Sequence, residues 1–365
     1  MNSLANKRPY QLLPAVFVFV TSLLWLSLAN AAGEDSIRTT DYYISHESNE
    51  PFYARHGVDP NVLLHVREVV MAGRERTVRE DGKVLVLIHG ATFPGYVAFD
   101  TNAGGASIMR HFAQLGWDTF ALDLEGYGMS TRPIIMDTPE AFPNDPAPIR
   151  SDVTMANVGR VVDFVRDLRG VDKVHLLGWS LGADIEAPRY TILHPDKVSK
   201  LVLLGVNYQG WGESEDDLSA ERDGYDNNKM IFGYPALIER WAGLGTKPEF
   251  VIRSAFDAYR EEHLASDPKS GERGGAVRAP AGRFFDLTLE KPHFDAEKIT
   301  VPTLVINGDA DADATQEDNQ ALMEALDGEE NKLVVIPGAG HFLHFEKVNM
   351  QFYSALQEFL DPKKN

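Results

Sequence analysis

The sequence contains no cysteine, so disulfide bonds, zinc thiolate sites and a cysteine nucleophile are excluded. Basic residues are also scarce: 35 Lys and Arg stand against 54 Asp and Glu, a formal net charge of −19. Because no basic stripe offsets this charge, the surface would repel a phosphate backbone, and nucleic acid is not an expected partner. The 365 residues, 44% of them hydrophobic, suffice for one large α/β domain with an insertion or for two modest domains.

The N-terminus has the pattern of a cleavable secretory signal. Lys7 and Arg8 precede an apolar run over residues 12–28, and Ala29-Asn30-Ala31 forms a small-x-small cleavage site. The alternative is an uncleaved membrane anchor, since the apolar run is long for a signal core. We predict a signal peptide over residues 1–31 and a periplasmic or secreted mature protein with no stable membrane insertion after cleavage.

After the signal, residues 32–61 are polar and turn-rich and predict an N-terminal arm over the domain surface.

The rest of the chain alternates strand and helix patterns. Short apolar runs then recur, bounded by Gly, Asp or Lys: LLHVREVVMAG, KVLVLIHG, DTFALDLEG, KVHLLGWS, KLVLLGVN, PTLVINGD and KLVVIPGAG. Such runs are typical of parallel strands buried on both faces, and the segments between them have helical spacing. The sequence therefore predicts an α/β fold with a mostly parallel, doubly wound sheet covered by helices on both sides.

One interval interrupts this alternation. Residues 208–298 contain helical pieces, an acidic run and the glycine-rich KSGERGGAVRAPAG, without a clear strand. A disordered linker would hold few aromatic residues, whereas this segment includes Trp241, Phe256 and Tyr259. We predict a helical cap over 208–298, inserted between a first core part (62–207) and a second (299–365).

The stretch GWSLG places one serine between two glycines, as Gly178-x-Ser180-x-Gly182. This pattern is the nucleophile elbow, in which a strained strand-to-helix turn raises the serine Oγ above the sheet edge. The preceding KVHLL predicts a buried strand, and the following LGADIEAPRYTILH predicts a helix, which is the context that the motif requires. A serine that only caps the helix is the structural alternative.

Taken together, these motifs resemble the α/β-hydrolase fold family over residues 62–362. The resemblance rests on LVLIHG at 85–90, DLEGYGMS at 123–130, GWSLG at 178–182, LVINGDADA at 304–312 and IPGAGHFLHFE at 336–346, in the family's order. It implies an eight-stranded type of sheet with an inserted cap and a serine nucleophile of the esterase and lipase kind. The chain departs from the family at Glu125, where relatives often have an arginine.

A serine needs a base within hydrogen-bond reach and an acid that orients the base. The resemblance places the base at His341, after the last strand, with His344 as the alternative. It places the acid at Asp311, in Gly-x-x-Asp form after Gly308, with Asp309 and Asp313 as competitors. Three alternating aspartates also suggest a calcium loop, but Ala314 and Gln320 stand where that loop needs Gly and Glu. We expect neither a metal nor a cofactor.

Negative charge developing on a tetrahedral intermediate requires two preorganised N–H donors. The resemblance assigns them to Leu181, directly after the nucleophile, and to Ala91, directly after His89-Gly90. His89 is expected to shape this single-glycine loop, and Thr92 to offer a side-chain hydroxyl. Phe93 and Trp179 are candidate substrate-binding residues in an apolar cleft, with ordinary core packing as the alternative.

The leading hypothesis is an exported serine hydrolase that cleaves a small-molecule carboxylic ester, lactone or amide through an acyl-enzyme. Serine at the elbow disfavours dehalogenase and epoxide hydrolase chemistry, which use aspartate there. Hydrolysis of a carbon–carbon bond and acyl transfer use the same triad and remain alternatives, as does a non-catalytic binding protein on the same scaffold. The sequence leaves the substrate and the oligomeric state open.

Overall fold

The structure is a computed structural model that describes residues 36–210, 215–227, 229–233, 238–289 and 291–361. The predicted signal peptide, residues 1–31, lies outside the described residues. Within the described ranges, no helix is long and apolar enough to cross a bilayer.

An eight-stranded sheet forms the centre of the molecule, in the order β1-β2-β4-β3-β5-β6-β9-β10. The strand β2 pairs antiparallel with β1 on one side and with β4 on the other, and all other neighbours in this sheet pair in parallel. The bounds are β1 (Ile37–Glu47), β2 (Asn61–Met71), β3 (Val84–Ile88), β4 (Asp118–Leu122), β5 (Val174–Trp179), β6 (Val198–Leu204), β9 (Thr303–Gly308) and β10 (Lys332–Ile336). The predicted α/β class with a mostly parallel sheet is confirmed.

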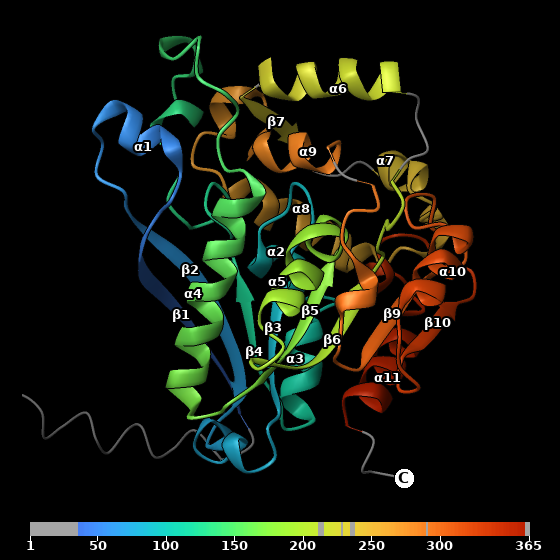
Figure 1. The fold of residues 1–365 in the computed structure, drawn as a ribbon. Coiled ribbons are helices and arrows are strands. Elements are labelled where there is room, and N and C mark those ends of the chain that lie inside the picture. The colour runs from blue at the N-terminus through green and yellow to red at the C-terminus, as the bar shows by residue number, and fades with distance from the viewer. Residues whose placement is uncertain (1–35, 211–214, 228, 234–237, 290, 362–365) are drawn as a thin grey trace, which may run out of the picture.

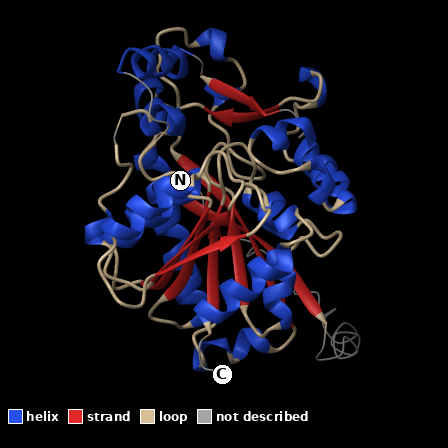
Figure 2. Ribbon diagram, turned by 90° about the vertical axis from the view of Figure 1, so that its right-hand side faces the viewer, coloured by secondary structure: helices blue, strands red, loops and turns tan. Residues whose placement is uncertain are grey.

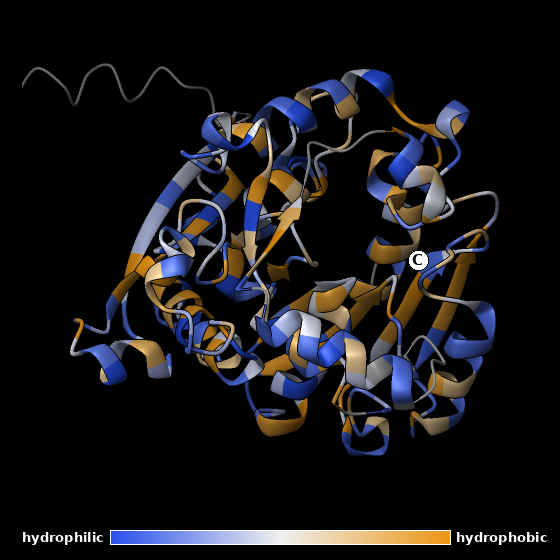
Figure 3. Cartoon of the chain, turned by 90° about the horizontal axis from the view of Figure 1, so that it is seen from above, coloured by the Kyte–Doolittle hydropathy of each residue, from blue (hydrophilic) through white to orange (hydrophobic). Residues whose placement is uncertain are grey.

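Helices cover both faces of this sheet (Figures 1 and 2). Their bounds are α1 (Pro51–His56), α2 (Gly95–Asp100), α3 (Ile108–Gln114), α4 (Ser151–Arg169), α5 (Ala187–Leu193), α6 (Glu215–Asn227), α7 (Ile238–Gly243), α8 (Arg253–Ala265), α9 (Gly282–Leu287), α10 (Gln316–Ala325) and α11 (Asn349–Leu360). Side chains of α4, α5 and α10 belong to one apolar cluster, and those of α2, α3 and α11 to a second one across the sheet. Figure 3 shows, from above, hydrophobic strands inside the molecule and more hydrophilic segments around them.

The N-terminal segment differs from the predicted surface arm. Residues Ile37–Glu47 form β1, the edge strand of the main sheet, which pairs with β2 along its whole length. Tyr42, Ile44 and His46 point inward at alternate positions and are at least partly buried, whereas the residues between them are exposed. Polar residues dominate this strand and only this period of two marks it in the sequence, which is why the sequence does not predict it.

The segment predicted as a cap lies between β6 and β9 and holds α6, α7, α8 and α9. Contrary to the expectation of no strand, it also contains a small antiparallel sheet of β7 (Met230–Gly233) and β8 (Val277–Pro280). Figures 1 and 2 show these elements above the main sheet. Because four-residue strands give little period-two pattern, the sequence did not reveal them.

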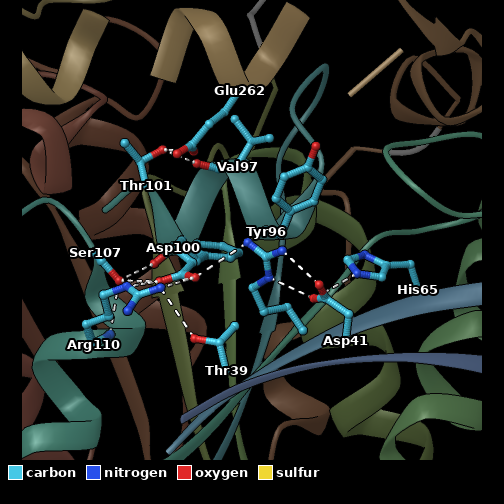
Figure 4. A network of polar contacts seen from close by, with 12 residues as sticks. Thr39, Asp41, His65, Tyr96, Val97, Asp100, Thr101, Ser107, Arg110 and Glu262 are labelled. Atoms are coloured by element: carbon cyan, nitrogen blue, oxygen red, sulfur yellow. Dashed lines mark hydrogen bonds and ion pairs between the residues drawn. The ribbon is translucent and has the colours of Figure 1, made fainter. Parts of the chain in front are cut away.

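A polar network ties the sheet edge to the helices of one face and to the cap (Figure 4). Asp41 of β1 accepts hydrogen bonds of 2.8 and 3.0 Å from Arg67 of β2. Asp100 of α2 pairs with Arg110 of α3 at 2.8 Å. Thr101 donates to Glu262 of α8 at 2.9 Å, so a hydrogen bond joins one helix of the inserted segment to the core.

Candidate active site

Ser180 stands at the turn that follows β5. Every residue of β5 is buried, and Ser180 itself is half-buried with φ of +54°. Left-handed backbone is costly for a residue with a side chain and persists only where the surrounding structure enforces it. The carbonyl of Ser180 accepts hydrogen bonds from the N–H groups of Ala183 and Asp184, at 2.6 and 2.9 Å, in the first turn of η6 (Gly182–Glu186). The geometry is therefore that of the predicted elbow.

His341 and Asp311 form a hydrogen-bonded pair. The Nδ1 of His341 lies 2.9 Å from Oδ2 of Asp311, and both side chains are buried. The other carboxylate oxygen, Oδ1, accepts the N–H groups of Asp313 and Ala314 at 2.9 and 3.0 Å. Because these two bonds fix the carboxylate, the acid in turn fixes the imidazole ring.

The two competitors for the acid position have other surroundings. Asp309 is exposed and accepts the N–H of Gly338 at 2.7 Å. Asp313 lies on the opposite side of the ring, where its Oδ2 is 3.9 Å from Nε2 of His341. The sequence offered Asp313 only as a competitor for Asp311 and did not predict that both carboxylates would lie beside the base, because this depends on the path of the loop after β9.

Burial by itself would lower the pKa of His341, but the charge and hydrogen bond of Asp311, together with the charge of Asp313, raise the pKa to about 9. The alternative base, His344, is fully buried against the rings of Trp179 and Phe99, and burial lowers its pKa to about 3. His344 is thus a packing residue, and of the two histidines only His341 lines the cavity described next.

Ser180 and His341 line one cavity of about 220 Å³. Its core side includes Ala91, Thr92, Phe93, Trp179, Asp313 and Phe342, and its other side is formed by Ile231, Arg240, Trp241, Leu244 and Phe284 from the segment between β6 and β9. The Phe93 ring stacks on Trp179 with a centroid distance of 5.9 Å, so both predicted substrate-binding residues lie at the cavity. The sequence did not single out Arg240, Ile231, Leu244 or Phe284, whose spacing carries no motif.

The loop after β3 brings Ala91 beside the nucleophile. A Cβ on Gly90 would lie 2.9 Å from Cβ of Ser180, so only glycine permits this approach. Within the described residues, the Ala91 N–H donates to no protein acceptor. Leu181 is buried in a small cluster with Ile185 and Leu287. Of the two residues predicted to supply oxyanion donors, Ala91 thus lines the same cavity as Ser180, and Leu181 follows Ser180 directly in the chain. Their catalytic role remains a prediction.

Glu125, which departs from the expected arginine, is buried away from this cavity. It accepts hydrogen bonds from Ser48 and Tyr53, both 2.8 Å long, and burial raises its pKa to about 7. Within the described part of the chain, no group of three or more His, Asp or Glu side chains could hold a metal ion.

An elbow serine, a buried acid–histidine pair and a cavity at the carboxyl ends of parallel strands define the class of protein. The model of the α/β-hydrolase fold matches residues 83–348, and the chain belongs to this family.

Among characterised relatives, the chain is 35% identical over 95 residues to a 2-hydroxy-6-oxononadienedioate/2-hydroxy-6-oxononatrienedioate hydrolase of Pseudomonas putida, covering 25% of this chain and 31% of the relative. It is 30% identical over 151 residues to an enzyme of the same name from Cupriavidus pinatubonensis, and this match covers 39% of this chain and 47% of the relative. The matches thus span less than half of these relatives' lengths. The solved 2-hydroxy-6-oxo-6-phenylhexa-2,4-dienoate hydrolase of a Rhodococcus strain superposes with a TM-score of 0.58 at 15% identity, covering 89% of this chain and 99% of that one, which shows the shared fold.

Proposed function

We propose that the protein is a serine hydrolase in which Ser180 attacks a carbonyl carbon. The observation that carries the proposal is the arrangement of three side chains: Ser180 and His341 line one cavity, and Asp311 holds Nδ1 of His341. His341 takes the serine proton at Nε2 and passes it to the leaving group, while Asp311 keeps the imidazole in the tautomer that allows this. Water then repeats the attack on the acyl-enzyme, and no cofactor takes part.

For the bond that is broken, we propose a carbon–carbon bond of a 2-hydroxy-6-oxo acid. The relatives' names describe substrates whose 6-oxo carbon has only carbon neighbours, so hydrolysis there has to break a carbon–carbon bond. These substrates are dioates, with a carboxylate at each end. Arg240 is the only Arg or Lys among the described residues that line the cavity, and it would attract one of these carboxylates.

A carboxylic ester is the second candidate, and Asp313 favours it. Its carboxylate lies at the cavity wall, 3.9 Å from Nε2 of His341, where it would repel an anionic group placed near the nucleophile. A neutral ester with an apolar acyl group avoids this repulsion and packs against Phe93 and Trp241. The two candidates therefore differ in which side chain sets the substrate preference: attraction by Arg240 favours an anionic substrate, and repulsion by Asp313 favours a neutral one.

The test compares a 2-hydroxy-6-oxo-dienedioate, followed by loss of its dienol absorbance, with p-nitrophenyl esters from acetate to long chains. Wild-type protein and Ser180→Ala are measured side by side, and products are analysed for transfer to other acceptors. Turnover of the dioate that the variant loses supports carbon–carbon hydrolysis, and turnover of esters alone supports the ester hydrolase. If the wild type cleaves neither and an organophosphate does not label Ser180, the protein is a binding protein on this scaffold and the proposal fails.

We also propose that the protein is exported, on the basis of the signal pattern over residues 1–31. N-terminal sequencing of the protein purified from its own cells tests this: a start near residue 32 supports export, and an intact Met1 in the cytoplasm removes its basis.

A further inference from the structure

Among the residues that the structure describes, the most completely buried Arg or Lys side chain comes from the inserted segment. Arg283, in the first turn of α9, is fully buried. A Cβ on Gly282 would lie only 2.4 Å from the carbonyl oxygen of Pro148, so the start of α9 packs directly on core backbone. The close packing sends the Arg283 side chain into the core, beneath the loop that follows β3.

There the guanidinium binds the backbone next to the nucleophile. Nη1 of Arg283 donates to the carbonyl oxygen of Gly90 at 3.0 Å, and Nη2 donates to that of His89 at 3.4 Å. The Gly90 carbonyl and the Ala91 N–H belong to the same peptide unit, which is planar and trans. Holding the oxygen on one side therefore aims the Ala91 N–H to the other side, and Ala91 lines the cavity.

His89 supports the same peptide. Its Nδ1 lies 2.9 Å from the Gly90 oxygen, and its Nε2 accepts the N–H of Leu124 at 3.2 Å. Nε2 is thus the unprotonated nitrogen, and Nδ1–H is the donor. The Gly90 oxygen receives two donors, one of them cationic, and such polarisation of the carbonyl makes the N–H at the other end of the amide a stronger donor.

The other half of the guanidinium holds the helix that follows the nucleophile. Nε and Nη2 of Arg283 form a two-pronged pair with Glu186, at 2.9 and 2.7 Å, and Thr154 donates to the same carboxylate at 2.7 Å. Glu186 ends η6, which starts directly after Leu181. One side chain therefore bridges the two backbone segments that carry Ala91 and Leu181.

From this geometry we infer that Arg283 is a positioning residue that holds the two N–H donors of the oxyanion site at the distance the reaction requires. This inference rests on the proposed function, because it takes the N–H groups of Ala91 and Leu181 as donors to the developing oxyanion. It also means that the inserted segment, besides covering the cavity, completes the reaction site.

The experiment measures labelling of Ser180 by diethyl p-nitrophenyl phosphate. The serine Oγ forms a bond to phosphorus, p-nitrophenolate leaves, and the serine proton passes to His341. The amplitude of nitrophenolate release counts folded sites, whereas the rate at saturating reagent reports how well the phosphoryl oxygen is held. A loss of fold lowers the amplitude, and a positioning defect lowers the rate.

Two variants are compared with wild type. Arg283→Lys keeps the charge but cannot bridge both segments, and Arg283→Met combined with Glu186→Gln leaves no buried unpaired charge. Arg150→Met is the matched control, because Arg150 anchors the same helix through Asp286 at 2.8 Å without touching the loop after β3. We expect the labelling rate of the double variant to fall about 100-fold, as on loss of an oxyanion donor, with unchanged amplitude and half-saturating concentration.

The labelling rate of Arg283→Lys should lie between those of wild type and the double variant, and Arg150→Met should be labelled at the wild-type rate. Rates within threefold of wild type in both Arg283 variants would overturn the inference and leave the proposed function intact. If the double variant releases no nitrophenolate because it does not fold, the labelling rate of Arg283→Lys alone decides, and a rate within threefold of wild type overturns the inference. If wild type itself is not labelled, the proposed function fails first, and the inference falls with it.

Discussion

The two sides of the cavity are built differently. The core side presents Ser180 and His341 from turns after β5 and β10, and Asp311, which holds His341, follows β9. Sheet hydrogen bonds hold these strand ends in fixed positions. The other side presents Arg240, Trp241 and Phe284 from short helices. The difference suggests a division of labour, in which the core performs the chemistry and the inserted segment selects what enters.

Arg283 would be the exception to this division. It belongs to the inserted segment in sequence, but its hydrogen bonds to Glu186 and Gly90 support the core side. Substitutions on the core side should therefore lower kcat, and those on the other side should change substrate preference, with Arg283 behaving as a core residue. The following substitutions test this contrast, beginning with the largest effect.

Asp311→Asn should lower kcat by about 10⁴-fold, because the amide can hold His341 in the wrong tautomer while preserving the shape of the site. KM should change little, and circular dichroism should match wild type. Asp309→Asn is the matched control, since that exposed carboxylate two residues away does not touch the histidine. Equal losses in both variants would show that the loop, and not the acid, matters.

The sequence predicted the core of this site because its parts are local. The elbow at Ser180 and the motifs around Asp311 and His341 lie on runs whose apolar character marks buried parallel strands. What the sequence did not predict depends on distant segments meeting. Arg283 and Glu186 are 97 positions apart, and neither residue's neighbours indicate a partner. The strand β1 stayed hidden for a different reason, since its outward residues are polar.

Arg240→Gln tests the selecting side. We expect kcat/KM for an anionic substrate to fall about 10-fold, as one charge-assisted contact is lost, with little change for a neutral ester. Arg253→Gln serves as the control, because that arginine is largely exposed on α8 and pairs with Asp257. An equal loss for anionic and neutral substrates would indicate that Arg240 acts on the cavity shape.

Asp313→Asn should shift the pH dependence of kcat/KM. The base works only when neutral, and the pKa of His341 is raised to about 9, so wild-type activity should rise with pH toward that value. Removing the carboxylate beside Nε2 lowers this pKa, and the midpoint should move down by about one pH unit. The pH profiles of both proteins on a neutral ester measure the shift, and coincident profiles would contradict the role of Asp313.

Glu125→Gln should alter stability and leave the reaction untouched, which sharpens the contrast within the core itself. Burial raises the pKa of Glu125 to about 7 from an ordinary value near 4.5, so the folded state binds its proton more tightly than the unfolded state. The folded state therefore loses stability as pH rises between these two values, and the neutral glutamine removes that contribution. Urea unfolding from pH 5 to 8 should give a smaller decrease in the free energy of unfolding for the variant than for wild type. Parallel decreases would mean that Glu125 is charged at equal cost in both states, and a change in kcat would contradict its separation from the cavity.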